Sequence, residues 1–186
     1  MRAFIAIDLP IRVKTQLGRI AQELRQSDCR ASWVKPDNLH ITMKFLGDTD
    51  DNLLQQVSEQ LDRLGQEQGP FAVTLGGLGF LPPQGRPRVL CVATGSQDRL
   101  AHLAHQLEQR LTPLGLQPER RFAAHVTLAR IKGDKNLAKL RQLASRVSLR
   151  QTFSVASLNL YSSHLHPDGA RYQLLHRGRF RLVAPR

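Results

Sequence analysis

Residues 38–47 read Asn-Leu-His-Ile-Thr-Met-Lys-Phe-Leu-Gly, and residues 123–130 read Ala-Ala-His-Val-Thr-Leu-Ala-Arg. Both segments contain a histidine, an apolar residue, a threonine and a second apolar residue in that order. Side chains alternate between the two faces of a β-strand, so the histidine and the threonine of each segment share one face. The apolar residues between them point to the other face, into a core. The repeat therefore predicts two similar lobes that each contribute one strand to a shared cleft.

Around these segments, the hydrophobic pattern predicts short strands and amphipathic helices. We expect strands at residues 2–8, 33–34, 39–46, 71–78, 88–94, 125–129, 147–153, 156–162 and 171–180, and helices at residues 11–26, 50–65, 97–111 and 136–146. This order indicates an α+β architecture with antiparallel pairing. A chain of 186 residues is within the usual length of one domain. Residues 1–186 are therefore expected to form one two-lobed domain.

The charge of the chain is positive and unevenly distributed. The sequence carries 27 Lys and Arg against 15 Asp and Glu, a formal net charge of +12. Residues 119–186 hold 14 of these basic residues but only 3 of the acidic ones. A local excess of this kind indicates either a binding face for a polyanion or a generally basic solvated surface, and the charge alone favours neither.

Cysteine content and hydropathy exclude several classes of protein. Cys29 and Cys91 are too few for a disulfide framework, and neither lies in a Cys-x-x-Cys motif that would indicate zinc or dithiol chemistry. No run of 18 apolar residues exists, so no membrane span is predicted. The amino-terminal residues meet Asp8 before a signal-peptide core is complete. We expect a cytoplasmic, monomeric protein with no membrane partner.

The two motif histidines have the chemistry of a general acid and a general base. An imidazole with an ordinary pKa of about 6.5 can give or take a proton near neutral pH. If His40 and His125 face one phosphorus atom, one removes a proton from an attacking water and the other protonates the departing oxygen. Thr42 and Thr127 can then donate hydrogen bonds to the phosphoryl oxygens, where negative charge develops. The symmetry of the repeat leaves the two roles unassigned, and the reaction needs no metal and no cofactor.

The sequence resembles the LigT-like RNA 2′,3′-cyclic phosphodiesterases, also called the 2′-5′ RNA ligase family, within the two-histidine phosphoesterase superfamily. The resemblance runs nearly end to end. The family's opening strand, two motifs and closing strands are matched by residues 4–10, 33–47, 120–130, 160–163 and 169–172. Two positions depart from the family pattern: Ala124 stands where many relatives have proline before the second histidine, and Cys91 where an aromatic residue is common.

The resemblance implies a bilobal fold with pseudo-two-fold symmetry. In such a fold each lobe is an antiparallel sheet backed by helices, and the active cleft lies between the sheets. The resemblance also implies metal-independent hydrolysis of an RNA-terminal 2′,3′-cyclic phosphodiester to a 2′-phosphomonoester, so the expected partner is RNA with such an end. By the same resemblance, His40 would be the proton donor to the leaving O3′, and His125 would be the proton acceptor that activates water.

Several basic residues near the motifs are candidates for contact with phosphate or RNA. Strict alternation places Arg130 opposite His125, yet a strand end can twist and a guanidinium suits phosphate. Arg130 is therefore a candidate phosphate ligand, with a surface ion pair as the alternative. Lys44 shares the parity of the first motif histidine and is expected either to meet the RNA backbone or, more simply, to be a charge at the rim. Arg86 and Arg88 flank a Gly- and Pro-rich loop and are candidates for holding RNA.

Other histidines and aromatic residues give less specific signals. His102 and His105 are three residues apart on an expected helix. Without an acidic or cysteine partner, they indicate a solvated helix face rather than a metal site. Trp33, Phe122 and Tyr161 are able to stack on bases. Packing is the favoured role for Trp33, whereas Phe122 is left open between the two roles.

Three classes of function remain. The first is the RNA cyclic phosphodiesterase. The second is a ligase that joins RNA ends through a 2′-5′ bond, which is the same reaction in reverse with a ribose 5′-OH in place of water. The third is a non-catalytic RNA-binding module, which the basic last third supports and the paired histidines oppose, because binding alone needs no such pair. Alanine at either histidine separates the classes, since a binder retains its affinity and an enzyme loses turnover.

Overall fold

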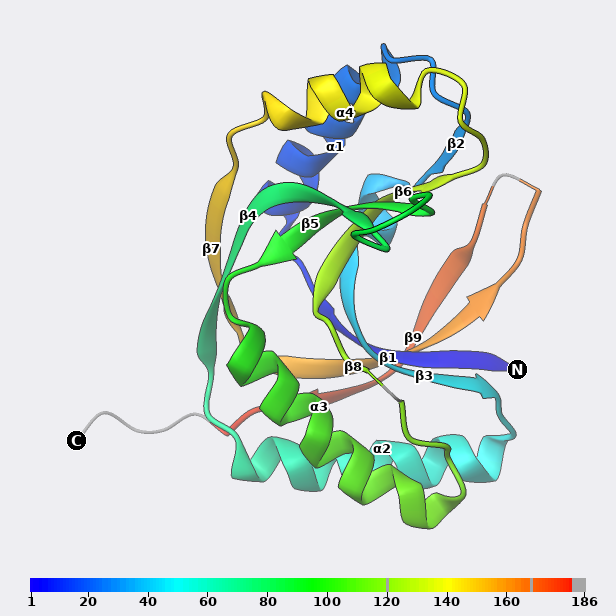
Figure 1. Ribbon diagram of the computed structural model, residues 1–186. Coiled ribbons are helices and arrows are strands. Elements are labelled where there is room, and N and C mark those ends of the chain that lie inside the picture. Colours follow the sequence, from blue (N-terminus) through cyan, green and yellow to red (C-terminus); the bar gives the residue numbers. More distant parts are fainter. Residues whose placement is uncertain (120, 168, 182–186) are drawn as a thin grey trace.

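The computed structural model describes residues 1–119, 121–167 and 169–181, and its elements follow the predicted order of strands and helices (Figure 1). The strands are β1 Arg2–Asp8, β2 Ala31–Trp33, β3 His40–Asp48, β4 Phe71–Leu81, β5 Val89–Thr94, β6 His125–Ile131, β7 Arg150–Val155, β8 Ser157–His164 and β9 Arg171–Arg179. The helices are α1 Ile11–Arg25, α2 Asp51–Glu67, α3 Gln97–Leu111 and α4 Leu137–Ser145, with 3₁₀ turns at Pro36–Asn38 and Thr112–Leu114. The predicted α+β class is confirmed.

One antiparallel sheet runs through the molecule and divides into two matching halves. Its strand order is β7-β4-β5-β6-β3-β1-β8-β9, with β2 added along β6. β6 and β3 are joined through a single residue pair, Ile41 with Val126, whereas their outer neighbours pair over much longer stretches. We call the strands from β7 to β6, with β2, the β6 half and the strands from β3 to β9 the β3 half. Each half contributes four strands to this order, with its motif strand innermost, which confirms the expected pseudo-two-fold arrangement.

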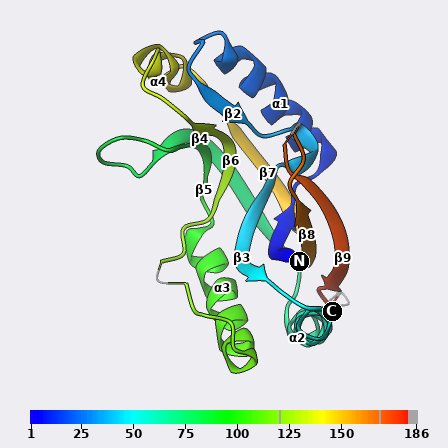
Figure 2. The same cartoon turned by 90° about the vertical axis from the view of Figure 1, so that its right-hand side faces the viewer.

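Two helices accompany each half of the sheet. Figures 1 and 2 show α1 and α4 together at the β6 half, and α2 and α3 together at the β3 half. The contacts agree: α4 packs on α1 and β4, α2 packs on β8 and β9, and α3 packs on β3. The apolar motif residues Ile41 and Val126 are fully buried in the core that these helices close. None of the helices in the described part of the chain is long and apolar enough to cross a membrane.

The close packing of α2 against β9 depends on two glycines. A Cβ atom added to Gly178 would lie 2.7 Å from the carbonyl oxygen of Leu61, and one added to Gly65 would meet the carbonyl oxygen of Arg179. Such contacts are closer than carbon and oxygen atoms allow, so helix and strand approach each other backbone to backbone. This packing holds the outer edge of the β3 half firmly.

The first motif strand carries a β-bulge that the sequence pattern did not reveal. Against β1, Ala6 pairs with Thr42 and Ile5 pairs with Lys44, so Met43 is an extra residue on β3. A bulge of this kind reverses the alternation of the residues that follow it. The prediction for Lys44 was wrong for this reason. Its side chain is 1% exposed and lies in the interior instead of at the RNA face or the rim.

The second motif strand has the same bulge at the equivalent place. Thr127 and Ala129 pair with consecutive residues of β5, which leaves Leu128 as the extra residue on β6. Ala129 is consequently buried and Arg130 is exposed. The alternation that placed Arg130 on the opposite face from the second histidine was therefore wrong, and the bulge turns this arginine toward the histidine.

Candidate active site

The two motif histidines share one face of the sheet, next to the pair that joins β3 to β6. Both His40 and Thr42 are half-buried, and so are His125 and Thr127, while the apolar residues between them are buried. Ile41 and Val126, the residues that directly follow the two histidines, pair across β3 and β6, so the histidines lie on neighbouring strands. We call this side of the sheet the histidine face. The prediction that the two motifs meet is confirmed by this arrangement.

Each histidine ring is held by the same hydrogen bond. Nδ1 of His40 lies 2.7 Å from the carbonyl oxygen of Asn38, and Nδ1 of His125 lies 2.8 Å from that of Ala123, in each case two residues earlier. A carbonyl only accepts, so Nδ1 carries the hydrogen in both rings. Nε2 is therefore the ring nitrogen without a hydrogen in the neutral form of each ring.

The surroundings of His40 favour its neutral form in the free protein. Burial lowers the pKa of His40, and Lys14 and His125 act in the same direction, while the carbonyl of Asn38 and the carboxylate of Asp8 oppose the change. Nε2 of His40 lies 3.0 Å from the hydroxyl of Thr42. Because the neutral ring has its hydrogen on Nδ1, the hydroxyl donates to Nε2.

A polar cluster supports His40 from β1 and β8, and the sequence pattern did not single it out. Oδ2 of Asp8 accepts hydrogen bonds from the hydroxyl of Tyr161 at 2.6 Å and from Nδ2 of Asn159 at 3.1 Å. Oδ1 of Asp8 pairs with Lys14 at 3.4 Å. Burial raises the pKa of Tyr161, and the hydrogen bond to Asp8 raises it further, so the phenol stays protonated as a donor. Tyr161 thus has a structural role beneath the site.

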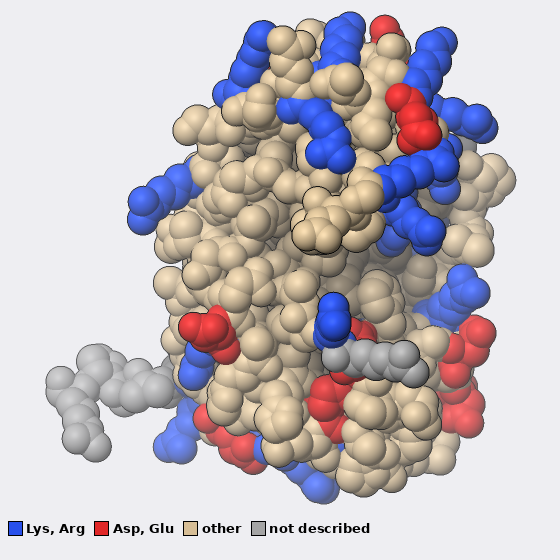
Figure 3. Space-filling model, viewed as in Figure 1, with Lys and Arg blue, Asp and Glu red and all other residues tan. Residues whose placement is uncertain are grey.

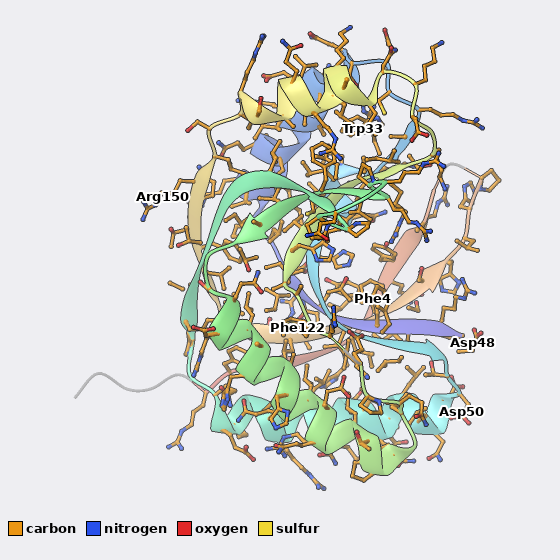
Figure 4. The ribbon with its side chains drawn as sticks, in the orientation of Figure 1. Phe4, Trp33, Asp48, Asp50, Phe122 and Arg150 are labelled. Atoms are coloured by element: carbon orange, nitrogen blue, oxygen red, sulfur yellow. The ribbon has the colours of Figure 1, made fainter. Side chains whose placement is uncertain are left out.

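Aromatic rings surround His40 on the histidine face. The ring of Phe4 lies 4.9 Å from that of His40 and 4.8 Å from that of Tyr172, and Tyr172 meets His40 edge-on at 5.5 Å. Phe45 stands beyond Phe4 at 6.4 Å and is 60% exposed. Figure 4 shows Phe4 in the middle of the molecule, with Trp33 nearer α4. When the two motifs are aligned, Phe45 occupies the position of Arg130, and this equivalence in the sequence would have identified Phe45 as a candidate site residue.

Arg130 faces this aromatic cluster from the other half of the sheet. Burial raises the pKa of Tyr172, and the positive charge of Arg130 counteracts that change, so the guanidinium lies near the phenol. Tyr172 in turn contacts the ring of His40. The structure therefore brings Arg130 to the histidine face.

The second motif is anchored through the residue before its histidine. The side chain of Gln97, at the start of α3, accepts the N–H of Ala124 at 3.1 Å and donates to its carbonyl at 2.7 Å. A proline at position 124 has no N–H to donate. The departure from the family pattern at Ala124 therefore adds a hydrogen bond that fixes the approach to β6.

The remaining predicted candidates lie away from the histidines or serve packing. His102 and His105 are exposed on α3, as expected for a solvated face. Trp33 and Phe122 are partly buried against the core, which confirms packing for Trp33 and shows that Phe122 packs there as well. Arg120, the first residue of the matched range 120–130, lies outside the described residues.

Cys91, at the second departure, is buried on β5, where it pairs with Thr127 of β6. Sγ of Cys91 donates to the carbonyl of Gly79 at 3.5 Å. Burial raises the pKa of Cys91 to about 11, so this side chain stays a neutral thiol. Within residues 1–119, 121–167 and 169–181, no cluster of three or more His, Cys, Asp or Glu side chains is arranged to hold a metal ion.

A sheet with an internal two-fold repeat, which brings two His-x-Thr strands together on one face, is the architecture of the two-histidine phosphoesterases. Comparison with family models gives the same assignment more narrowly. The model for LigT-like phosphoesterases matches residues 7–91 and again residues 92–172, so each copy contains one motif. The chain belongs to the LigT-like phosphoesterase family.

Individual relatives agree over nearly the whole chain. The RNA 2′,3′-cyclic phosphodiesterase of Thermotoga maritima is 32% identical over 181 residues, which cover 97% of this chain and 96% of the relative. That of Aeropyrum pernix is 33% identical, over 87% of this chain and 93% of the relative. Among solved structures, the protein TT0787 of Thermus thermophilus superposes with a TM-score of 0.84 at 27% identity, covering 99% and 100% of the two chains. LigT of E. coli, complexed with 3′-AMP, gives 0.75 at 26% identity over 96% and 97%.

Proposed function

We propose that this protein hydrolyses the 2′,3′-cyclic phosphate at an RNA end to a 2′-phosphomonoester, with residues 1–186 acting as one two-lobed domain. The observation that carries the proposal is the pair of histidines whose rings are both held through Nδ1, which leaves Nε2 as the reactive atom of each. The RNA 2′,3′-cyclic phosphodiesterases among the relatives support the same substrate class. All residues of the proposed site come from one chain, so a monomer is sufficient.

The reaction is an in-line displacement at phosphorus. Nε2 of His125 takes a proton from water, and the water oxygen forms a bond to phosphorus. The bond from phosphorus to O3′ breaks on the opposite side, and Nε2 of His40 delivers a proton to O3′. The phosphate remains bonded to O2′, and the two rings exchange protonation states, which solvent then restores.

Three donors are available for the charge that develops on the phosphoryl oxygens. Thr42 and Thr127 stand on the histidine face beside their histidines, and Arg130 reaches the same face through the bulge in β6. Hydrogen bonds from a charged guanidinium are about twice as strong as those between neutral groups. Arg130 therefore supplies the largest of the three contributions to phosphate binding.

Substrate binding also prepares His40 for its role as the acid. Burial keeps the pKa of His40 low in the free protein, which favours the neutral ring. A bound cyclic phosphate places a negative charge against Nε2, and an opposite charge at this distance favours protonation. The substrate thus raises the pKa of the histidine that must protonate its leaving group.

The direction of bond cleavage tests the assignment of the two roles. An RNA oligonucleotide that ends in 2′,3′-cyclic phosphate is incubated with the protein and then digested to nucleosides. We expect the terminal nucleoside as its 2′-monophosphate. A 3′-monophosphate would show that the substrate binds in the flipped orientation, so that His40 and His125 exchange roles. If the protein does not open the cyclic phosphate at all, the proposed function itself is overturned.

Chelation tests whether a metal takes part. The proposed site supplies imidazole, hydroxyl and guanidinium groups, and hard divalent cations prefer carboxylate and carbonyl oxygens. We expect the rate in excess EDTA to equal the rate without it. A rate that disappears in EDTA and is restored by one divalent ion would contradict the proposed mechanism.

A further inference from the structure

A second basic surface adjoins the histidine face at Arg130. Beside the loop from β4 to β5, the protein has a hollow of about 800 Å³ with Pro82 and Pro87 in its wall. Four cationic side chains line it, namely Arg86, Arg88, Arg130 and Lys132. None of the described residues that line it carries a carboxylate. The hollow is therefore suited to an anion with more than one charge.

Most of this positive charge is not neutralised by the protein. Arg86 pairs with Asp134 at 2.9 Å, and both side chains are largely exposed. For the other three cations, no carboxylate of the described residues lies within ion-pair distance. Like charges held together without counter-charges repel one another, and a bound polyanion relieves that repulsion.

The backbone fixes the hollow next to the proposed catalytic site. Val89 pairs with Arg130 across β5 and β6, and the N–H of Ile131 donates to the carbonyl of Arg88 at 2.8 Å. Arg130 is three residues beyond Thr127, about 10 Å along a strand. A phosphate held by the histidines and the next phosphates of the same RNA strand can thus be bound by one continuous row of cations.

We propose that this hollow binds the phosphates on the 5′ side of the terminal nucleotide, so that the protein prefers RNA oligonucleotides to cyclic mononucleotides. The inference rests on the proposed function, because it places the cyclic end at His40 and His125. Arg130 lies at the junction and serves the cyclic phosphate. Arg88 and Lys132 then serve the phosphates that precede it.

The basic residues elsewhere on the surface do not share this arrangement. Figure 3 shows Lys and Arg gathered over the upper, β6 half of the molecule, whereas Asp and Glu are more frequent over the lower half. On α1 and after α4, Arg19 and Arg146 line a different hollow, which also includes the carboxylate of Glu23. Arg19 and Arg146 provide a control pair of equal charge in the same half.

Three substrates with one terminal nucleoside test the proposal. They are the nucleoside 2′,3′-cyclic phosphate, the same compound with a 5′-phosphate, and a trinucleotide that ends in it. The value of kcat/KM is measured for each, at several salt concentrations, with the native protein, Arg88→Ala/Lys132→Ala and Arg19→Ala/Arg146→Ala. Thermal unfolding of all three proteins shows whether the substitutions leave the fold intact.

We expect kcat/KM of the native protein to rise with each added phosphate, by about tenfold for a charge-assisted contact. The ratio of the trinucleotide to the cyclic mononucleotide should fall at least fivefold in Arg88→Ala/Lys132→Ala and remain unchanged in the control pair. The salt dependence should weaken in parallel, by about 0.7 in the logarithmic slope for each phosphate of a single strand that the variant no longer binds.

Other outcomes separate the two proposals. If the native protein hydrolyses the cyclic mononucleotide and the trinucleotide equally well, the hollow does not bind RNA, although the proposed function stands. The same conclusion follows if the control pair loses the preference as much as Arg88→Ala/Lys132→Ala does. If only the 5′-phosphate matters and the longer chain adds nothing, the hollow binds a nucleotide phosphate rather than RNA. If no cyclic phosphate is opened at all, the proposed function fails.

Discussion

The two motif strands have the same backbone and different side chains beyond the threonine. β3 and β6 both hold their histidine through a carbonyl two residues earlier, and both bulge directly after the threonine. After the bulge, the inward position is Lys44 in β3 and Ala129 in β6, and the outward position is Phe45 in β3 and Arg130 in β6. The repeat thus retains the histidine, the threonine and the bulge in both strands, and it varies the residues that follow the bulge.

This difference gives a symmetric pair of histidines an asymmetric environment. Around His40 the neighbours are the rings of Phe4 and Tyr172, whereas on the strand of His125 the outward position after the bulge is Arg130, which lines a basic hollow. A ribose with a cyclic phosphate can approach two equivalent histidines in two orientations. The aromatic side and the cationic side make these orientations unequal, because the base and the RNA backbone prefer different surfaces.

Replacing either histidine removes a feature that both motif strands share, and we expect the largest loss of activity from this change. His40→Ala and His125→Ala should each lower kcat by about 10²–10⁴, the usual contribution of one general acid or base. Single-turnover rates on an RNA with a cyclic end measure the loss. Because both groups act in one step, the double variant should lose much less than the product of the two single effects.

Matched controls for these variants are present on α3. His102 and His105 are exposed there, and alanine at either position should leave kcat unchanged. A motif variant that retained kcat within threefold of the native protein while still binding RNA would favour a non-catalytic RNA-binding module.

The inward position after the bulge differs between the two strands, and substitution of Lys44 tests what this difference contributes to stability. Nζ of Lys44 lies 2.8 Å from Oε1 of Glu108 and donates to the carbonyl of Gln117, so this buried ion pair ties β3 to α3 and the segment that follows. Removing one partner leaves the other charge without compensation in the interior. Lys44→Ala should therefore lower the free energy of unfolding by about 3–5 kcal/mol in urea titrations.

An exposed ion pair provides the control for Lys44. Arg86 and Asp134 have nearly the same separation, 2.9 Å, but lie at the surface. Arg86→Ala should change the free energy of unfolding by less than about 1 kcal/mol. Similar losses in both variants would contradict the structural role of Lys44, as would a Lys44→Ala protein of native stability with weaker RNA binding.

The fate of Lys44 shows which features the sequence could predict and which it could not. The order of strands and helices follows from hydrophobic periodicity, and the meeting of His40 and His125 follows from the repeat. Both are statements about short segments, which a single sequence records directly. The bulges are different, because an extra residue on one strand is defined only by its pairing with another. Lys44 and Arg130 both follow a bulge, so strict alternation placed both on the wrong face.

The polar and aromatic residues around His40 could not be predicted from the sequence for a related reason. Asp8, Asn159 and Tyr172 come from three strands, and only the order β3-β1-β8-β9 brings them beside the first motif. Nothing in the local sequence of these residues separates them from ordinary strand positions. The equivalence of Phe45 and Arg130, by contrast, follows from aligning the two copies of the repeat in the sequence alone.

Substitution at the outward position sharpens the comparison between the halves. Arg130→Ala should lower kcat/KM about 10–100-fold, because a charge-assisted contact to phosphate contributes about 1.5–3 kcal/mol. Arg130→Lys should recover part of this loss, since lysine retains the charge without the planar pair of donors. Phe45→Ala should chiefly raise the KM of the RNA substrate, through loss of contact with its nucleobase. An Arg130→Ala enzyme with native kcat/KM would remove this residue from the phosphate site.

The smallest effect, a shift in the pH dependence, tests the unequal surroundings of the two histidines. If His40 is the acid, kcat falls as the pH rises through the pKa that His40 has in the substrate complex, because the neutral ring has no proton on Nε2 to donate. Asp8 raises the pKa of His40 and Lys14 lowers it. Asp8→Asn should therefore move the alkaline limb of kcat to lower pH, and Lys14→Met should move it to higher pH. The opposite signs distinguish this effect from general damage to the site. If the two substitutions instead move the acidic limb, His40 must lose a proton to become active, so it is the base and His125 is the acid.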